Sequence, residues 1–176
     1  LLRRHPHVFP DGTLQSVRDS ASVASEAEIK KNWETIKQQE RSEVGTGGTL
    51  DDIPLALPAL SRAFKLQKRA ANTGFDWSNI SDVVDKVKEE IAELEVEIAK
   101  GDSQAMEEEL GDLLFSCVNL ARHLAIDPEK ALALASDKFK RRFQAMEAAV
   151  GQGRFADLSL DEMELQWIQA KGLESL

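Results

Sequence analysis

Two pairs of acidic residues have a spacing that suits the binding of a metal ion. Glu90 and Glu93 are three positions apart, and so are Glu109 and Asp112. On an α-helix, three positions leave two side chains about 60° from direct overlay, so each pair shares one face of its helix. Carboxylate oxygens are hard ligands that suit Mg²⁺ or Mn²⁺ better than Zn²⁺. Each pair can therefore bind one divalent cation.

The chain between the two pairs contains signals that would fold them against each other. Gly101 favours the end of one helix, and Asp102 and Ser103 favour the start of the next. The break predicts an antiparallel helical hairpin that brings the carboxylates together, where they repel one another unless a cation neutralises them. The alternative is a solvated acidic face. The spacing alone does not decide between the two, because the chain has 31 Asp and Glu residues.

Apolar residues repeat at helical spacing along both predicted helices. The two stripes consist of Ile80, Val83, Val84, Val87, Ile91, Leu94 and Ile98, and of Met106, Leu110, Leu113, Leu114, Cys117, Leu120, Ala121 and Leu124. Glu90 directly precedes Ile91, and Asp112 directly precedes Leu113, so these carboxylates border the predicted core. Because an unpaired charge is unfavourable there, the pattern favours a metal site over a solvated face.

The rest of the chain also reads as helical. Its further helices are predicted through Phe64 to about Asn72, from Asp127-Pro128 to Gly151, and from Ser159 to Gly172. Asp127 with Pro128, and Ser159 with Glu162, are typical start signals of helices. No run alternates apolar and polar residues between turn signals, so the fold class is predicted to be all-α.

Composition limits the partners and the compartment. Lys and Arg number 22 against 31 Asp and Glu, and the net charge of −9 disfavours nucleic acid or an anionic membrane as a partner. No run approaches the roughly 18 apolar residues of a membrane span. The single Cys117 cannot form an internal disulfide and falls on the apolar stripe, so we predict that it is a core residue. These features predict a cytoplasmic protein.

Several short sequence segments surround the acidic pairs. They are Asp51-Asp52-Ile53-Pro54, Leu57-Pro58-Ala59-Leu60, Lys68-Arg69-Ala70-Ala71-Asn72-x-Gly74-Phe75-Asp76-Trp77, Asp85-Lys86-Val87, Gly111-Asp112-Leu113-Leu114-Phe115, Val118-Asn119-Leu120-Ala121-Arg122 and Lys138-Phe139-x-Arg141-Arg142-Phe143. Together with Glu89-Glu90-x-x-Glu93 and Glu109-x-x-Asp112, they resemble the MazG family of the all-α nucleoside triphosphate pyrophosphohydrolases. The resemblance implies an antiparallel helical bundle that hydrolyses a range of (deoxy)nucleoside triphosphates to the monophosphate and pyrophosphate.

The resemblance also implies roles for individual residues. Mg²⁺, which Mn²⁺ could replace, would be held by Glu90, Glu93, Glu109 and Asp112. The nucleotide would be bound by Lys86, Lys138, Arg141, Arg142, Trp167 and Lys171. The alternative for the basic residues around Arg142 is a solvated face. Phe75 and Trp77 are either core plugs or walls of a base pocket.

The two ends of the chain share a pattern that suggests duplication. Arg3-Arg4 followed by Trp33-x-x-x-Lys37 repeats the plan of Arg141-Arg142 followed by Trp167-x-x-x-Lys171. Many members of the MazG family carry two copies of the domain. We therefore expect residues 1–50 to be the tail of a preceding, truncated copy with a linker, and residues 51–176 to be a complete domain.

The apolar surface of the predicted hairpin is wider than a single stripe. Leu94, Ile98, Leu114 and Val118 extend it, and a helix with more than one apolar face is normally buried in a bundle or an interface. We therefore expect a homodimer in which the four-helix core is completed across the two chains.

Two other functions remain open. A specialised relative, such as a dUTP or phosphoribosyl-ATP pyrophosphohydrolase, would share the acidic signature, because base selectivity depends on the shape of the pocket. A helical regulatory module without activity is the alternative from another class. The intact acidic pairs and the intact Arg141-Arg142 pair favour the enzyme over that module.

Overall fold

The computed structural model of the protein describes residues 13–15, 25, 48–151 and 153–173. The chain divides into two compact units, Leu1–Asp52 and Ile53–Leu176. Most of the first unit lies outside the described residues, including the predicted pattern of Arg3-Arg4 and Trp33. The origin of residues 1–50 as the tail of an earlier copy therefore stays a prediction.

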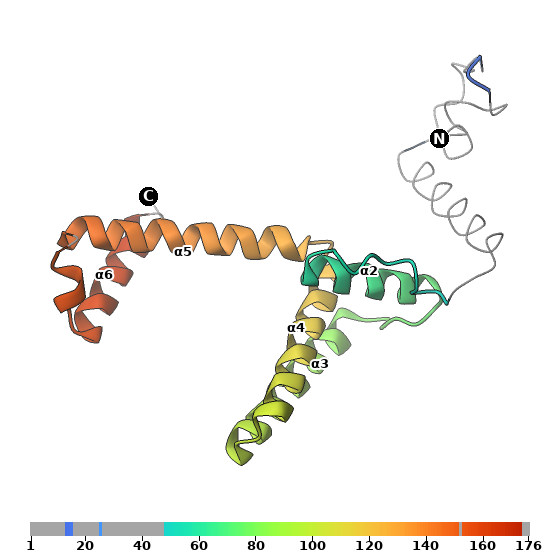
Figure 1. Ribbon diagram of the computed structural model, residues 1–176, viewed down its shortest axis with the longest axis horizontal. Helices are drawn as coiled ribbons and strands as arrows, with labels where there is room; N and C mark the ends of the chain where they lie inside the picture. Colours follow the sequence, from blue (N-terminus) through green and yellow to red (C-terminus); the bar gives the residue numbers. More distant parts are fainter. Residues whose placement is uncertain (1–12, 16–24, 26–47, 152, 174–176) are drawn as a thin grey trace. The chain divides into compact units, whose positions relative to one another are not determined.

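The second unit is built from helices (Figure 1). They are α2 (Ala59–Asn72), α3 (Ile80–Lys100), α4 (Ser103–His123), α5 (Pro128–Val150), a short 3₁₀ helix η2 (Phe155–Asp157) and α6 (Leu160–Leu173). The described residues contain no β-strand. The predicted all-α class is therefore confirmed, and the helix ends agree with the predicted signals.

The helix boundaries follow from local capping chemistry. Gly101 ends α3 with φ of 75°, a left-handed conformation that glycine adopts without the steric penalty of a Cβ atom. Asp102 then begins α4, because its Oδ1 accepts hydrogen bonds from the backbone N–H groups of Gln104 at 3.1 Å and Ala105 at 3.2 Å. These two residues produce the tight turn of the predicted hairpin.

The starts of α5 and α6 use two other capping devices. Asp127 Oδ1 accepts a hydrogen bond from the backbone N–H of Lys130 at 3.1 Å, and Pro128 occupies the first helical position. At the start of α6, Glu162 Oε2 accepts hydrogen bonds from Ser159 N at 2.8 Å and from Ser159 Oγ at 2.7 Å. Both predicted start signals are therefore confirmed.

The helices pack in a chain of neighbours. α3 and α4 lie side by side along their length as an antiparallel hairpin (Figure 1). α2 packs against α4 and against α5, and α6 packs against α5. The buried apolar residues are few among the described ones, namely Ile53, Val83, Val118, Met146 and Ala170. No helix in the described part of the chain is both long and apolar enough to span a membrane.

Much of the predicted apolar stripe is exposed within one chain. Ile91, Ile98, Leu110 and Leu114 are between 43% and 58% exposed. The prediction that Cys117 is a core residue is wrong, because this side chain is exposed. The buried face of α4 carries Ser116, Val118 and Asn119, and a helical step of about 100° per residue turns position 117 away from that face.

Candidate metal and nucleotide site

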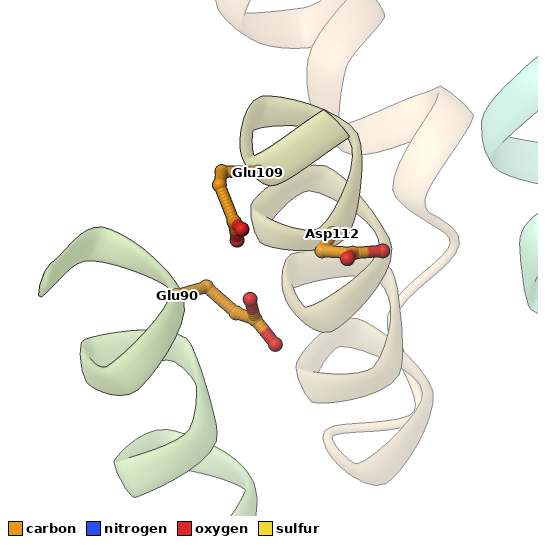
Figure 2. A group of neighbouring side chains, drawn as sticks. All are labelled: Glu90, Glu109 and Asp112. Atoms are coloured by element: carbon orange, nitrogen blue, oxygen red, sulfur yellow. The ribbon is translucent and has the colours of Figure 1, made fainter. Parts of the chain in front are cut away.

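Three of the four predicted carboxylates meet between α3 and α4. Glu90 of α3 faces Glu109 and Asp112 of α4 (Figure 2). Each side chain offers one oxygen atom, and these atoms all lie within 4.8 Å of one another. Glu90 is buried, Glu109 is half-buried and Asp112 is exposed. The cluster therefore reaches from the inside of the hairpin to its surface, where a ligand can enter.

The surroundings of Glu90 fit a bound cation. Only 4% of this residue is exposed. Its Oε1 forms an ion pair with Lys86 Nζ at 2.9 Å. Its Oε2, by contrast, is buried and has no hydrogen-bond partner among the described residues. A buried carboxylate oxygen without a partner is unfavourable. A divalent cation between Glu90, Glu109 and Asp112 would remove this cost, and the all-oxygen set suits Mg²⁺ or Mn²⁺.

Glu93, the fourth predicted ligand, is not part of the group of close oxygens. Its side chain is exposed on α3, one turn after Glu90. The pKa of Glu93 is raised, chiefly by desolvation and further by the carboxylates of Glu90 and Glu109, while the Lys86 ammonium partly offsets the rise. The structure therefore places Glu93 in the negative field of the cluster, but outside the cluster itself.

Lys86, a predicted nucleotide-binding residue, lies against the same cluster. Its Nζ donates to Glu89 Oε1 at 2.7 Å and contacts Glu90 Oε1 at 2.9 Å. The hydrogen bonds to Glu89 and Glu90 raise the pKa of Lys86, so the side chain stays protonated at neutral pH. Because 32% of this side chain is exposed, its charge can also be reached by a bound anion.

The other predicted nucleotide-binding residues lie on α5 and α6. The Arg142 guanidinium carbon is 5.7 Å from the centroid of the Trp167 ring, a cation–π distance. Trp167 also packs against Phe139, with ring centroids 5.4 Å apart. The remaining members of the predicted set are exposed on the same two helices, namely Lys138, Arg141 and Lys171. The predicted site residues therefore form two groups, one on the hairpin and one on α5 and α6.

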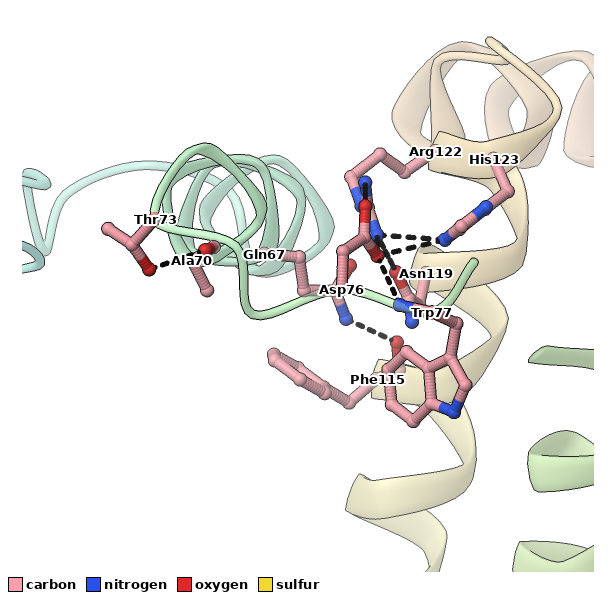
Figure 3. Close-up of polar contacts among 9 residues, drawn as sticks. All are labelled: Gln67, Ala70, Thr73, Asp76, Trp77, Phe115, Asn119, Arg122 and His123. Atoms are coloured by element: carbon pink, nitrogen blue, oxygen red, sulfur yellow. Dashed lines mark hydrogen bonds and ion pairs between the residues drawn. The ribbon is translucent and has the colours of Figure 1, made fainter. Parts of the chain in front are cut away.

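A network around Asp76 was not predicted from the sequence. Asp76 lies in the loop between α2 and α3, and its carboxylate binds Arg122 at the end of α4 through two hydrogen bonds, one of them 2.9 Å long (Figure 3). His123 Nε2 is 3.0 Å from the same carboxylate. The hydrogen bonds from Arg122 hold the pKa of Asp76 down to about 2. Asp76 and Arg122 both occur in the sequence segments quoted above, but no spacing rule pairs positions so far apart.

A second contact that the sequence did not predict joins α2 to α4. The buried Gln67 donates from Nε2 to the backbone carbonyl of Phe115 at 2.8 Å (Figure 3). Phe115 lies three positions after Asp112, so this hydrogen bond fixes α2 beside the part of α4 that carries Asp112. A polar residue inside an otherwise apolar helix face was the only available signal.

The aromatic residues of the α2–α3 loop are not core plugs of this chain. Phe75 is 78% exposed and Trp77 is 41% exposed. Of the two interpretations of these rings, the one that buries them is therefore wrong. The other interpretation, as walls of a base pocket, stays a prediction.

Sequence comparisons with known proteins match the part of the chain that carries the acidic cluster. Residues 79–146 match the model of the MazG nucleotide pyrophosphohydrolase domain. The matched range includes all four predicted acidic ligands. The chain is 46% identical over 178 residues to a nucleoside triphosphate pyrophosphohydrolase of Escherichia coli K12, with 99% of this chain and 64% of the relative covered. It is 40% identical over 174 residues to the nucleoside triphosphate pyrophosphohydrolase/pyrophosphatase MazG of Thermotoga maritima, with 98% and 62% covered.

A third relative is longer. The chain is 42% identical over 177 residues to the uncharacterized protein YabN of Bacillus subtilis, of which it covers 34%. The chain thus spans less than two thirds of the length of each of these relatives. The described fold and the acidic cluster agree with this match, and the chain contains a domain of the MazG family at residues 79–146.

Proposed function

We propose that this chain hydrolyses nucleoside triphosphates to the monophosphate and pyrophosphate with the help of a divalent cation. The observation that carries the proposal is the buried Glu90, whose Oε2 has no hydrogen-bond partner among the described residues and which faces Glu109 and Asp112. The activity named for the Escherichia coli and Thermotoga maritima relatives supports the same reaction.

The acidic residues would hold the cation. Glu90, Glu109 and Asp112 are its proposed ligands, and Glu93 stays a predicted fourth ligand. Mg²⁺ is the proposed cation and Mn²⁺ its proposed substitute. When bound, such an ion supplies charge neutralisation on phosphate oxygens and activation of water. The three carboxylates come from two helices, so the rigid hairpin sets where the ion and the substrate phosphates can lie.

The cationic residues would bind the triphosphate. Lys86 stays protonated beside the acidic cluster, where it can contact a phosphate oxygen that is close to the cation. Arg142 presents a planar guanidinium that can bind phosphate with two hydrogen bonds, and Trp167 offers a ring on which a base or ribose can stack. The other proposed nucleotide-binding residues are Lys138, Arg141 and Lys171.

We further propose that the active species is a homodimer. The support is the exposed apolar surface of the hairpin, to which Ile91, Ile98, Leu110 and Leu114 contribute. Such a surface on two adjacent helices is costly in water, and a second copy offers a matching apolar surface around a twofold axis. A location in the cytoplasm stays a prediction from the sequence.

A product assay tests the proposed reaction. The protein is incubated with a panel of ribonucleoside and deoxyribonucleoside triphosphates, including dUTP and also phosphoribosyl-ATP, with and without Mg²⁺. The proposal expects monophosphate and pyrophosphate from several of these substrates, and no turnover in excess EDTA. Release of the diphosphate and phosphate, or full activity in EDTA, would reject it. Turnover of dUTP or phosphoribosyl-ATP alone would indicate a specialised relative.

A further inference from the structure

The two ends of the α3–α4 hairpin are held together in different ways. At one end, the covalent turn at Gly101 and Asp102 joins the helices. At the other end, α3 begins and α4 finishes without a direct connection between them. There the loop that leads into α3 is tied to the end of α4 by Asp76, which binds Arg122 and contacts His123 (Figure 3).

The acidic cluster lies between these two ends and tends to push the helices apart. Glu90 on α3 faces Glu109 and Asp112 on α4 with oxygen atoms within 4.8 Å. Like charges at this range repel, and only one of them is paired with Lys86. Without a cation, this repulsion is resisted by the turn at one end and by the contacts of Asp76 at the other.

The contact around Asp76 is suited to that task because it is rigid and poorly exposed. The side chains of Arg122 and Asp76 are 13% and 28% exposed. Arg122 uses its fork for both carboxylate oxygens of Asp76, and its Nε and Nη2 also donate to Asn119 Oδ1 at 3.1 and 2.7 Å. Asn119 is only 4% exposed, so it fixes the orientation of the guanidinium. Such a two-pronged pair resists sliding and rotation more than a single exposed ion pair does.

We infer that Asp76 and Arg122, oriented by Asn119, are positioning residues that hold the open end of the hairpin and set the distance between Glu90 and the Glu109–Asp112 pair. We call the three residues the hairpin clamp. The inference rests on the proposed function, since it assumes that these carboxylates bind a cation. It adds that residues two or more turns away from the carboxylates determine how well that cation is bound.

The test compares Mg²⁺ affinity in variants of the whole chain without nucleotide. Thermal unfolding is followed during a Mg²⁺ titration for the wild type, Asp76→Asn and Arg122→Lys. Supporting shells around a metal site typically change affinity by about 10- to 100-fold, so we expect Asp76→Asn to raise the half-saturating Mg²⁺ concentration by about tenfold. Arg122→Lys keeps the charge but loses the fork, so a smaller increase is expected.

Asp85→Asn is the matched control. It removes an ion pair within α3, the one between Asp85 and Lys88 at 2.8 Å, whose side chains are 70% and 69% exposed. This variant loses the same charge from the same part of the chain, but it leaves the hairpin clamp intact. Its half-saturating Mg²⁺ concentration is expected to equal that of the wild type.

Pyrophosphate release separates positioning from a general loss of structure. At saturating Mg²⁺, Asp76→Asn is expected to regain a rate within a factor of about two of the wild type, because excess cation draws the carboxylates together. Glu90→Gln, which lacks a ligand, is not expected to recover.

Three results decide the matter. A lower melting temperature of Asp76→Asn with an unchanged half-saturating Mg²⁺ concentration would show that the contact is only structural and would overturn the inference. The inference would also be overturned if a folded Asp76→Asn variant kept a low activity at saturating Mg²⁺. A wild type that responds to neither Mg²⁺ nor Mn²⁺ would instead overturn the proposed metal site, a failure that is visible before any variant is made.

Discussion

At the scale of single residues, Glu90 combines two features that rarely occur together. It is a charged side chain that is 4% exposed, and one of its oxygens lacks a hydrogen-bond partner among the described residues. Lys86 offsets part of the burial cost, but it binds only the other oxygen, Oε1. The Glu90 side chain faces Glu109 and Asp112, where a cation would compensate all three carboxylates.

Replacing Glu90 with Gln should therefore abolish turnover while the chain still folds. The amide keeps the shape of the side chain but removes the charge, so we expect the rate to fall by at least about 100-fold, as for other misplaced catalytic groups. Glu95→Gln is the matched control, because Glu95 is exposed on the same helix. The measurement is kcat and KM for one nucleotide, with the melting temperature recorded with and without Mg²⁺. Equal turnover in the two variants would contradict the proposed site.

Arg142 tests the second group of residues in the same manner. Its guanidinium lies over the Trp167 ring and the residue is half-buried, so Arg142→Ala removes a charge and a ring contact at once. We expect kcat/KM to fall by about 10-fold or more, with a melting temperature that drops by only a few degrees, because a cation–π contact contributes about 0.5–1 kcal/mol near the surface. Lys140→Ala, at an exposed position of α5, should leave both unchanged. A fully active Arg142→Ala would mean that the basic residues of α5 are a solvated face.

At the scale of elements, the start and end of each helix were predictable because capping is local chemistry. Gly101, Asp102, Pro128 and Ser159 act within one turn of the chain, and the structure confirms each of them. The meeting of Glu90 with Glu109 and Asp112 followed from the same turn, because a short hairpin fixes which residues face each other.

Contacts between distant elements were not predictable in this way. Asp76 and Arg122 are 46 positions apart, and Gln67 and Phe115 are 48 apart. Their pairing depends on how α2 and its loop pack on α4, which a periodic pattern does not specify. The predicted burial of Cys117 failed for a related reason, because periodicity shows which helix face is apolar but not what covers that face.

The turn of the hairpin can be tested through stability. Gly101 has φ of 75°, and a Cβ atom there would meet no atom within 4 Å. Gly101→Ala should therefore lower stability through backbone strain alone, by about 1 kcal/mol. Gly111→Ala is the control inside α4, where a Cβ atom also meets nothing within 4 Å and the helical backbone suits alanine. Urea denaturation should show opposite signs for the two changes. A stabilising Gly101→Ala would show that the hairpin does not depend on this turn.

The hairpin clamp predicts a pH dependence with a definite sign. The pKa of Asp76 falls from 3.8 to about 2 in the folded chain, chiefly through the hydrogen bonds from Arg122. The ionised form therefore stabilises the fold above pH 3.8, and this contribution is lost as the pH falls toward about 2. We expect the wild type to melt higher than Asp76→Asn at pH 5 to 7, with the gap closing below about pH 4. A gap that stays constant down to pH 2 would exclude the ion pair as its cause.

At the scale of the whole molecule, the described chain buries little of its apolar surface. Its buried apolar residues are few, while large apolar side chains on both helices of the hairpin remain half exposed. The proposed ligands of the cation lie on the hairpin, whereas Arg142 and Trp167 lie on α5 and α6. A second copy would cover the apolar surface. It would also allow each acidic cluster to work with the cationic residues of its own chain or with those of the second copy.

The last prediction is that the chain is a homodimer in solution and that the apolar face of the hairpin forms the contact. Light scattering on gel-filtered protein at micromolar concentration should give twice the chain mass of 19.5 kDa. Leu114→Glu places a charge on a side chain that is 51% exposed in one chain, so it should dissociate the dimer and lower the activity. Leu55→Glu is the control, because Leu55 is 81% exposed and lies outside the hairpin. A wild-type mass near 19.5 kDa with undiminished hydrolysis would show that one chain is sufficient for activity, and that the exposed apolar face is not a dimer contact.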